Sequence, residues 1–199
     1  GWKESVSPYT KHYSHDVYII NCSVYGGTEN VGFPDPNYNN TIRNCILQSA
    51  GIENVKIEST QNNNAPNKGY NYVRYNRIIN SGATSVTIYS ASHYVIVENN
   101  EMMGASQFAV RIYMASNNII RNNVIHDVEE GGIKVRDKGT FTKNNTIMNN
   151  IIYNVIPVAG RPNAGIWVNK YEVDTDTDPS DTYILSNTIY NATDGIKIE

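Results

Sequence analysis

Residues 98–136 have the sequence ENNEMMGASQFAVRIYMASNNIIRNNVIHDVEEGGIKVR and contain one pattern twice. Asn100-Glu101-Met102 recurs 23 residues later as Asn123-Val124-Ile125, and Val110-Arg111-Ile112 recurs at the same distance as Ile133-Lys134-Val135. Two apolar residues around one variable residue are the period-two pattern of a strand with one buried face. The stretch therefore predicts two similar coils that are built from short strands.

Both signatures continue along the chain. The asparagine signature begins at Asn21, Asn44, Asn76, Asn100, Asn123, Asn150 and Asn187, in steps of 23, 32, 24, 23, 27 and 37 residues. The second signature centres on Lys56, Thr87, Arg111, Lys134, Trp167 and Lys197. Coils of this length are typical of a β-helix, in which an inward Asn can bond the coils on either side. The sequence predicts an all-β, parallel β-helix solenoid of about seven coils.

The chain has the composition of one domain. We expect residues 17–199 to form the solenoid and residues 1–16 to form a capping segment over an apolar outer face. That face consists of Ile79, Met103, Val124, Ile151, Tyr153 and Tyr190. The net charge of −3 and the lack of a long apolar run indicate neither nucleic acid nor a membrane as a partner. The abrupt ends favour a module of a larger, secreted or cell-surface bacterial protein.

The stacked signatures of residues 17–199 resemble the pectate-lyase-like superfamily of right-handed parallel β-helices. The resemblance implies a right-handed solenoid. It leaves the function open, because this fold is used by lyases, hydrolases, epimerases, phage tailspikes and binding modules.

Stacking brings the variable residues of successive coils into rows on one outer face. Neighbouring members of a row are about 4.8 Å apart, and a β-linked sugar advances a comparable distance along its chain. We expect aromatic rings to meet the apolar faces of sugars, and Arg, Lys and Asn side chains to bond hydroxyl or acid groups. The predicted ligand-binding residues are Tyr89, Arg111, Tyr113, Lys134, Arg136, Trp167 and Asn169. Alternatively, they are ordinary solvated strand residues.

Catalytic motifs of related enzymes are missing. The Asn-Thr-Asp, paired-Asp and Gly-His-Gly motifs of pectin hydrolases are absent. The outer rows contain only Glu58 and Glu199 in place of the carboxylate cluster of calcium-dependent pectate lyases. The pair His126-Asp127, with Glu129 and Glu130 beyond it, could serve acid-base chemistry but is interpreted as a bend with solvated charges.

Residues 87–92, 110–118 and 131–136 resemble the alginate and chondroitin lyases of this fold. The resemblance implies that their lysine base and arginine acid would fall near Tyr89 and Tyr113. An ordinary Tyr titrates near pH 10, so tyrosine replaces both roles poorly. We therefore predict that the chain is not an enzyme.

The predicted function is that of a non-catalytic carbohydrate-binding module, similar to the β-helical modules attached to bacterial xylanases. Its partners would be a plant cell-wall polysaccharide, with xylan favoured, and an appended glycoside hydrolase domain. The enzymatic alternative is a polysaccharide lyase for acidic polymers that uses Lys134, Arg111 and Arg136. A structural or adhesive β-helix is the third interpretation.

Two further features of the sequence each have two interpretations. Asp174, Asp176 and Asp178 are spaced so that they form either a structural calcium site or a solvated acidic loop, and no other cofactor is expected. Cys22 and Cys45 should occupy matching positions in adjacent coils, with or without a disulfide between them.

Overall fold

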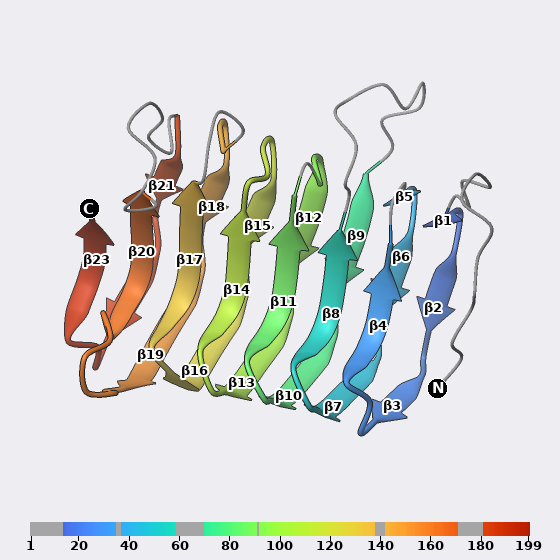
Figure 1. The fold of residues 1–199 in the computed structure, drawn as a ribbon, viewed down its shortest axis with the longest axis horizontal. Helices are drawn as coiled ribbons and strands as arrows, with labels where there is room; N and C mark the ends of the chain where they lie inside the picture. Colours follow the sequence, from blue (N-terminus) through green and yellow to red (C-terminus); the bar gives the residue numbers. More distant parts are fainter. Residues whose placement is uncertain (1–13, 35–36, 59–69, 91, 138–141, 171–180) are drawn as a thin grey trace.

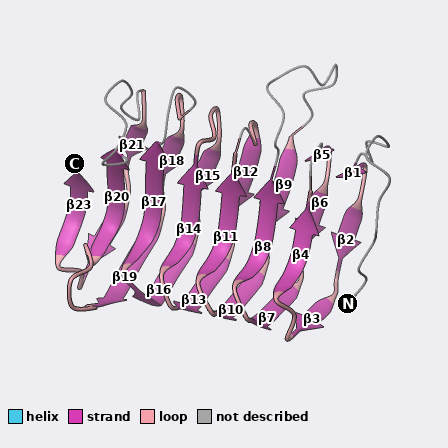
Figure 2. Cartoon of the chain, in the orientation of Figure 1, coloured by secondary structure: helices cyan, strands magenta, loops and turns pink. Residues whose placement is uncertain are grey.

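The computed structural model describes residues 14–34, 37–58, 70–90, 92–137, 142–170 and 181–199 (Figure 1). These residues form strands, turns and bends and contain no helix (Figure 2). Within them there is accordingly no helix long and apolar enough to span a membrane. Three parallel sheets of seven strands run the length of the molecule, which confirms the predicted solenoid of seven coils.

We name the sheets by their places in Figure 1. The front sheet contains β4 (Glu29–Phe33), β8 (Glu53–Glu58), β11 (Thr84–Tyr89), β14 (Phe108–Tyr113), β17 (Gly131–Asp137), β20 (Ala164–Lys170) and β23 (Asp194–Ile198). The base sheet contains β3 (Ser23–Tyr25), β7 (Ile46–Ala50), β10 (Arg77–Ser81), β13 (Glu101–Ala105), β16 (Val124–Glu129), β19 (Ile151–Ile156) and β22 (Thr188–Tyr190). The back sheet contains β2 (Tyr18–Ile20), β6 (Thr41–Arg43), β9 (Asn71–Arg74), β12 (Val95–Glu98), β15 (Ile119–Arg121), β18 (Thr146–Met148) and β21 (Tyr183–Leu185).

The core is formed by columns of aliphatic side chains, one column for each inward strand position. On the front sheet, Val55, Val86, Val110, Ile133 and Ile166 are fully buried. Matching columns of Leu, Ile, Met and Val line the base and back sheets. Because equivalent residues stack, the period-two alternation of each strand fixes which side chains point outward.

The predicted asparagine ladder runs through Asn76, Asn100, Asn123, Asn150 and Asn187. Each Oδ1 accepts a hydrogen bond from the backbone N–H of the preceding ladder residue, at 2.9–3.0 Å. Each Nδ2 donates to a backbone carbonyl of the preceding coil, at 2.8–3.1 Å. The ladder thus satisfies backbone groups that the turns leave unpaired.

The first two coils differ from the prediction. The strand register aligns Cys22 and Cys45 with Asn76, so these cysteines, and not Asn21 and Asn44, occupy the ladder position. Asn21 and Asn44 have φ angles of 57° and 56°, in the left-handed region that Asn tolerates well. The predicted ladder is therefore one residue out of register in these two coils.

The cysteines continue the ladder with weaker bonds. The backbone N–H of Cys22 donates to Sγ of Cys45 at 3.4 Å. Both thiols are free, Cys22 exposed and Cys45 buried, so the structure contains no bridge between them.

A second asparagine ladder was not predicted. The backbone N–H of Asn40 donates to Oδ1 of Asn71, and that of Asn118 donates to Oδ1 of Asn145, both at 3.1 Å. Asn71, Asn118 and Asn145 each lie five residues before a member of the first ladder. This constant offset was the available signal.

Little of the expected capping segment can be described, because residues 1–13 lie outside the described part of the chain. Ser14–His15 (β1) pairs with Asn37–Tyr38 (β5), and the rings of His15 and Tyr38 stack at 4.9 Å. The expected cover over the base sheet therefore stays a prediction.

Candidate functional site

The outer rows of the front sheet lie in the predicted register. Arg111, Lys134 and Trp167 pair across β14, β17 and β20. Tyr89, Tyr113, Arg136 and Asn169 form the neighbouring row. All seven predicted ligand-binding residues therefore lie on one sheet, over four consecutive coils.

Lys134 is the most constrained side chain of this surface. It points out of the sheet, yet only 7% of its surface is exposed. Its Nζ atom lies 3.5 Å from the ring centroid of Trp167 and 4.9 Å from that of Phe108. The two rings cover the amine from neighbouring coils and exclude much of the water around it.

Phe108 belongs to the site although it was not predicted. It lies at the start of β14, where its register partner on β17 is Gly131. A Cβ atom at Gly131 would come within 2.8 Å of the Phe108 ring, so glycine leaves room for the ring to lie there. The pairing of an aromatic residue with a glycine one coil later was the available signal.

The environment lowers the pKa of Lys134 to about 7. Burial is the largest cause, because it penalises the charged ammonium form. The guanidinium groups of Arg136 and Arg111 act in the same direction, as does Arg161 more weakly, while Glu130 opposes them. A large fraction of Lys134 is therefore a neutral amine at neutral pH, which is the form that can accept a proton.

Both arginines lie close to the Tyr113 ring. The guanidinium carbon of Arg111 is 5.8 Å from the ring centroid and that of Arg136 is 6.0 Å from it. Forked guanidinium groups are well suited to bind a carboxylate. The site thus places two potential carboxylate ligands next to a potential base.

Tyr89 and Tyr113 stack on each other with their centroids 5.1 Å apart and an interplanar angle of 17°. Stacking covers the facing sides of both rings. What the pair presents outward is mainly ring edges and hydroxyl groups, which favours hydrogen bonding over sugar–ring packing.

Trp167 forms the other border of the site. One face of its ring is covered by the Lys134 ammonium, and its Nε1 donates to Glu199 at 3.2 Å. Glu199 is also paired with Lys197 at 2.7 Å. Asn169 is buried beside Arg136 in the second row.

A second polar cluster lies on the base sheet. His126 is 9% exposed, with Nδ1 2.7 Å from Asp127 and Nε2 3.5 Å from Glu101. Its ring stacks on Tyr153 at 5.0 Å, and Tyr153 stacks on Tyr190 at 5.1 Å. The predicted solvated bend is therefore wrong for His126, because a neighbouring ring and two carboxylates surround it.

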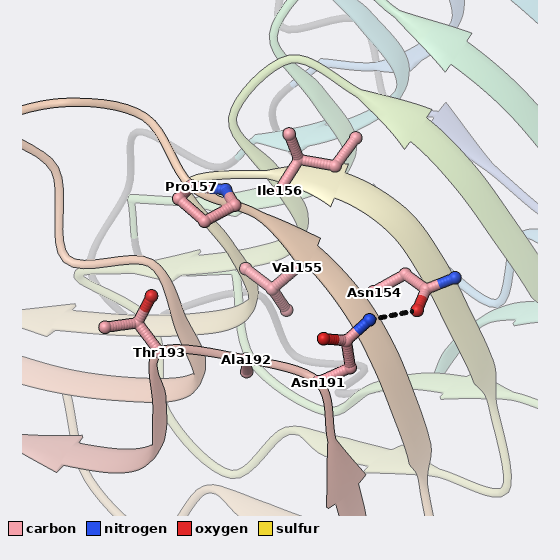
Figure 3. Close-up of a pocket in the computed structure, with 7 residues that line it drawn as sticks. All are labelled: Asn154, Val155, Ile156, Pro157, Asn191, Ala192 and Thr193. Atoms are coloured by element: carbon pink, nitrogen blue, oxygen red, sulfur yellow. Dashed lines mark hydrogen bonds between the residues drawn. The ribbon is translucent and has the colours of Figure 1, made fainter.

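A pocket of about 350 Å³ lies next to the base sheet. Figure 3 shows the residues that line it. It is lined by Asn154, Val155, Ile156, Pro157, Asn191, Ala192 and Thr193. The Asn191 amide donates to Oδ1 of Asn154 at 2.7 Å. None of these seven described side chains is ionisable.

Metal binding receives no support from the described residues, which contain no cluster of three or more His, Cys, Asp or Glu side chains that could hold an ion. Asp174, Asp176 and Asp178 lie outside the described residues. The calcium interpretation of that segment stays a prediction.

Comparison with known proteins defines the family of the fold. Residues 67–199 match the family model described as a right handed beta helix region. The crystal structure of the periplasmic alginate epimerase AlgG is similar, with a TM-score of 0.63 and 14% identity over 89% of this chain and 40% of that one. The A-module of the Azotobacter vinelandii mannuronan C-5 epimerase AlgE4 is similar, with a TM-score of 0.52 and 12% identity over 93% of this chain and 56% of that one. No curated protein sequence matches.

The chain spans about half or less of the length of these two structures, and at such identities the likeness is one of fold. Both similar structures are nevertheless enzymes that modify polysaccharides. This finding contradicts the prediction that the chain is not an enzyme. It does not confirm the finer resemblance to xylanase-attached modules.

Proposed function

The chain belongs to the right-handed β-helix family, and on that premise we propose that it is an enzyme that removes the C5 proton from a uronic acid in an acidic polysaccharide. The observation that carries the proposal is the position of Lys134, which is buried under the rings of Trp167 and Phe108 and lies between Arg111 and Arg136. This environment lowers the pKa of Lys134 to about 7. Strongly perturbed lysines on a ligand-accessible face are candidates for general bases.

The reaction begins at the carbon next to the carboxylate. The neutral amine of Lys134 takes the C5 proton, and the electron pair of the C–H bond moves into the carboxyl group. Arg111 and Arg136 bind that group and stabilise its second negative charge. In a lyase, these electrons then form a C4–C5 double bond, the bond from C4 to its glycosidic oxygen breaks, and the oxygen leaves with a proton.

Tyr113 is the proposed proton donor to the leaving oxygen. Its ring is held by Tyr89 on one side and by Arg136 on the other, which fixes the position of the hydroxyl. The reaction produces one unsaturated sugar and one new reducing end. The substrate is cut without the addition of water.

A C5 epimerase is the second candidate, and it is favoured by the two epimerases among the similar solved structures. The first step is the same. A proton then returns to C5 from the opposite face of the sugar, and the glycosidic bond remains intact. One of these epimerases is described as periplasmic. A polysaccharide substrate would likewise place this chain outside the cytoplasm.

Incubation with a panel of acidic polysaccharides in D₂O tests the shared first step. Deuterium at C5 of an inverted sugar would identify an epimerase, and ultraviolet absorbance from unsaturated ends would identify a lyase. Lys134→Met should abolish both signals. The same substitution at Lys143, which is exposed and lies outside the strands of the front sheet, should change neither.

If no polymer of the panel yields deuterium or unsaturated ends, the proposed function is wrong. The same conclusion follows if Lys134→Met is as active as the unmodified protein.

A further inference from the structure

The charged residues of the back-sheet strands all lie in one outward row. Arg43, Arg74, Glu98 and Arg121 are register partners across β6, β9, β12 and β15. They point outward, because the residue before each of them is fully buried in the core. Three guanidinium groups and one carboxylate leave this row with a net charge of +2.

The carboxylate of this row is already bound. Glu98 is buried and accepts a hydrogen bond from Nε of Arg121 at 2.8 Å, with Nη2 of the same arginine 2.7 Å away. Nη1 of Arg74 lies 4.0 Å from the other carboxylate oxygen, which is too long for a hydrogen bond. Arg121 therefore matches the charge of Glu98, and the charges of Arg43 and Arg74 remain.

Arg43 and Arg74 lie on neighbouring strands, which are about 4.8 Å apart. Arg43 forms no ion pair with any described residue, and the Nε atoms of both arginines are buried without a hydrogen-bond partner. Like charges directly opposite each other destabilise a sheet, so an anion that binds to both guanidinium groups would relieve their repulsion. Forked N–H groups are best matched by a carboxylate.

Tyrosine rings surround Arg74. Its guanidinium carbon lies 4.9 Å from the ring centroid of Tyr72, which is 6.1 Å from that of Tyr70. Tyr70 in turn meets Tyr94 edge-on at 5.8 Å. Tyr70 is 43% exposed, and Tyr75, the residue after Arg74, is 54% exposed. Such rings can pack against the apolar face of a sugar while their hydroxyl groups form hydrogen bonds.

Two of these tyrosines have a left-handed backbone, with φ angles of 57° at Tyr75 and 61° at Tyr94. Asn44 and Asn99 occupy the position of Tyr75 in the adjacent coils, and Asn117 occupies that of Tyr94 in the next coil. Asn tolerates this conformation, whereas a bulky ring makes it costly. Strain of this kind is typical of positions where the side chain is needed for function.

We propose that Arg43 and Arg74, together with the surrounding tyrosines, form a second binding site that holds a uronic acid residue of an acidic polysaccharide without reacting with it. The arginines and rings themselves call for an anionic ligand with an apolar face. That this ligand is the substrate of the front sheet rests on the proposed function. A polymer bound at both sheets would be retained more strongly than at either one alone.

Calorimetric titration with short oligosaccharides tests the second site, because each oligosaccharide can occupy only one sheet. The protein carries Lys134→Met, so that it does not consume the ligand, and the ligands are tetrasaccharides of alginate, polygalacturonate and hyaluronan. We expect two binding events per chain with at least one of these ligands. Arg43→Gln with Arg74→Gln should weaken one event by about tenfold or more, and Arg111→Gln with Arg136→Gln should weaken the other. Arg77→Gln, which removes an arginine paired with Glu101 on the base sheet, is the matched control and should weaken neither.

Tyr75→Asn separates a role in binding from a role in folding. It should raise the urea concentration at the midpoint of unfolding, because Asn tolerates the left-handed backbone, and it should weaken the back-sheet event by about fivefold. Tyr183→Asn removes an exposed tyrosine of the same sheet, four strands from β9, and should leave binding unchanged. Undiminished binding by Tyr75→Asn would overturn the assignment of its ring to this site.

The outcomes also separate the second site from the proposed reaction. Titrations that do not respond to the Arg43 and Arg74 variant overturn the inference, whatever the front sheet does. Equal retardation of the protein in gels that contain dextran sulfate, with the same dependence on these arginines, overturns the choice of a uronic acid. If no polymer gains deuterium or unsaturated ends but an event that depends on Arg43 and Arg74 is observed, the proposed function fails and the second site stands.

Discussion

The outer faces of the front and base sheets both contain stacked aromatic rings, but the groups that surround the ionisable side chain differ between them. On the base sheet, both ring nitrogens of His126 lie near carboxylates, which can accept hydrogen bonds from the ring. On the front sheet, Lys134 lies under two rings and between two arginines, and burial works against its charge. Stacked rings alone therefore do not mark a functional site. A functional site is better indicated by an ionisable group whose surroundings disfavour its charged form, because such an arrangement costs stability.

Lys134→Met should have the largest effect of any single substitution. We expect the rate of C5 deuterium incorporation to fall by about 10²–10⁴-fold, the usual contribution of a general base. The same variant should be more stable by about 2 kcal/mol at pH 6, because an apolar side chain replaces a buried charge. Urea unfolding measures the second effect. A variant that loses both activity and stability would contradict this account.

The stability gain depends on pH. Lysine titrates near 10.5 in the unfolded chain and at about 7 in the folded one, so between these values the unfolded state binds more protons. The stability of the unmodified protein therefore rises with pH across this window. The advantage of Lys134→Met is full below pH 7 and decreases as the pH rises toward 10.5.

The sequence was sufficient for the fold and for the rows of the front sheet. Once the Val-Lys-Ile type signatures are aligned, period-two alternation determines which residues point outward, and Arg111, Lys134 and Trp167 lie as expected. The sequence misaligned the ladder in the first two coils because Asn occurs at two successive positions of a coil. One is the left-handed residue, as in Asn44, and the other is the ladder residue itself, as in Asn76.

The chemistry of the site could not be predicted in the same way. The charge state of Lys134 depends on Phe108 and Trp167, which are contributed by other coils, and on how far their rings cover the amine. Row alignment places these residues near one another but does not give their burial. The charge state depends on burial, which is why the sequence favoured binding over catalysis.

Removal of one hydroxyl group from each stack gives a sharper comparison. Tyr113→Phe keeps the stack with Tyr89 and removes the proposed proton donor, so we expect cleavage to slow by about 10²-fold. Tyr153→Phe makes the same change in the base-sheet stack and should leave the rate unchanged. Initial rates of ultraviolet absorbance measure both. Equal effects of the two substitutions would remove Tyr113 from the mechanism.

The pH profile of kcat/KM measures how the charges around Lys134 affect its pKa. Activity should rise through about pH 7 as Lys134 loses its proton, provided that Arg111, Arg136, Arg161 and Glu130 keep their charges. Arg136→Gln removes the larger of the two arginine effects, so the pKa of Lys134 and the rising limb should move to higher pH. Activity at pH 7 should fall, both because less of the amine is neutral and because the substrate carboxylate loses one of its two guanidinium ligands.

Glu130→Gln is the opposite change at the same lysine. It removes a negative charge that favours the ammonium form, and the rising limb should move to lower pH. If both substitutions shift the limb in the same direction, the titrating group is not Lys134.

His126→Ala should have the smallest effect on catalysis and still be measurable in stability. The substitution removes the stack with Tyr153 and leaves Asp127 and Glu101 without their shared partner. A cost of about 1–2 kcal/mol in the free energy of unfolding is expected, with an unchanged rate of C5 deuterium incorporation. Met103→Ala, at the register partner of His126 on β13, is the matched control for lost packing in the same row. If His126→Ala slowed turnover while Met103→Ala did not, the base-sheet cluster would share in the reaction. Carboxylate partners around the ring would then no longer distinguish a structural stack from a functional one.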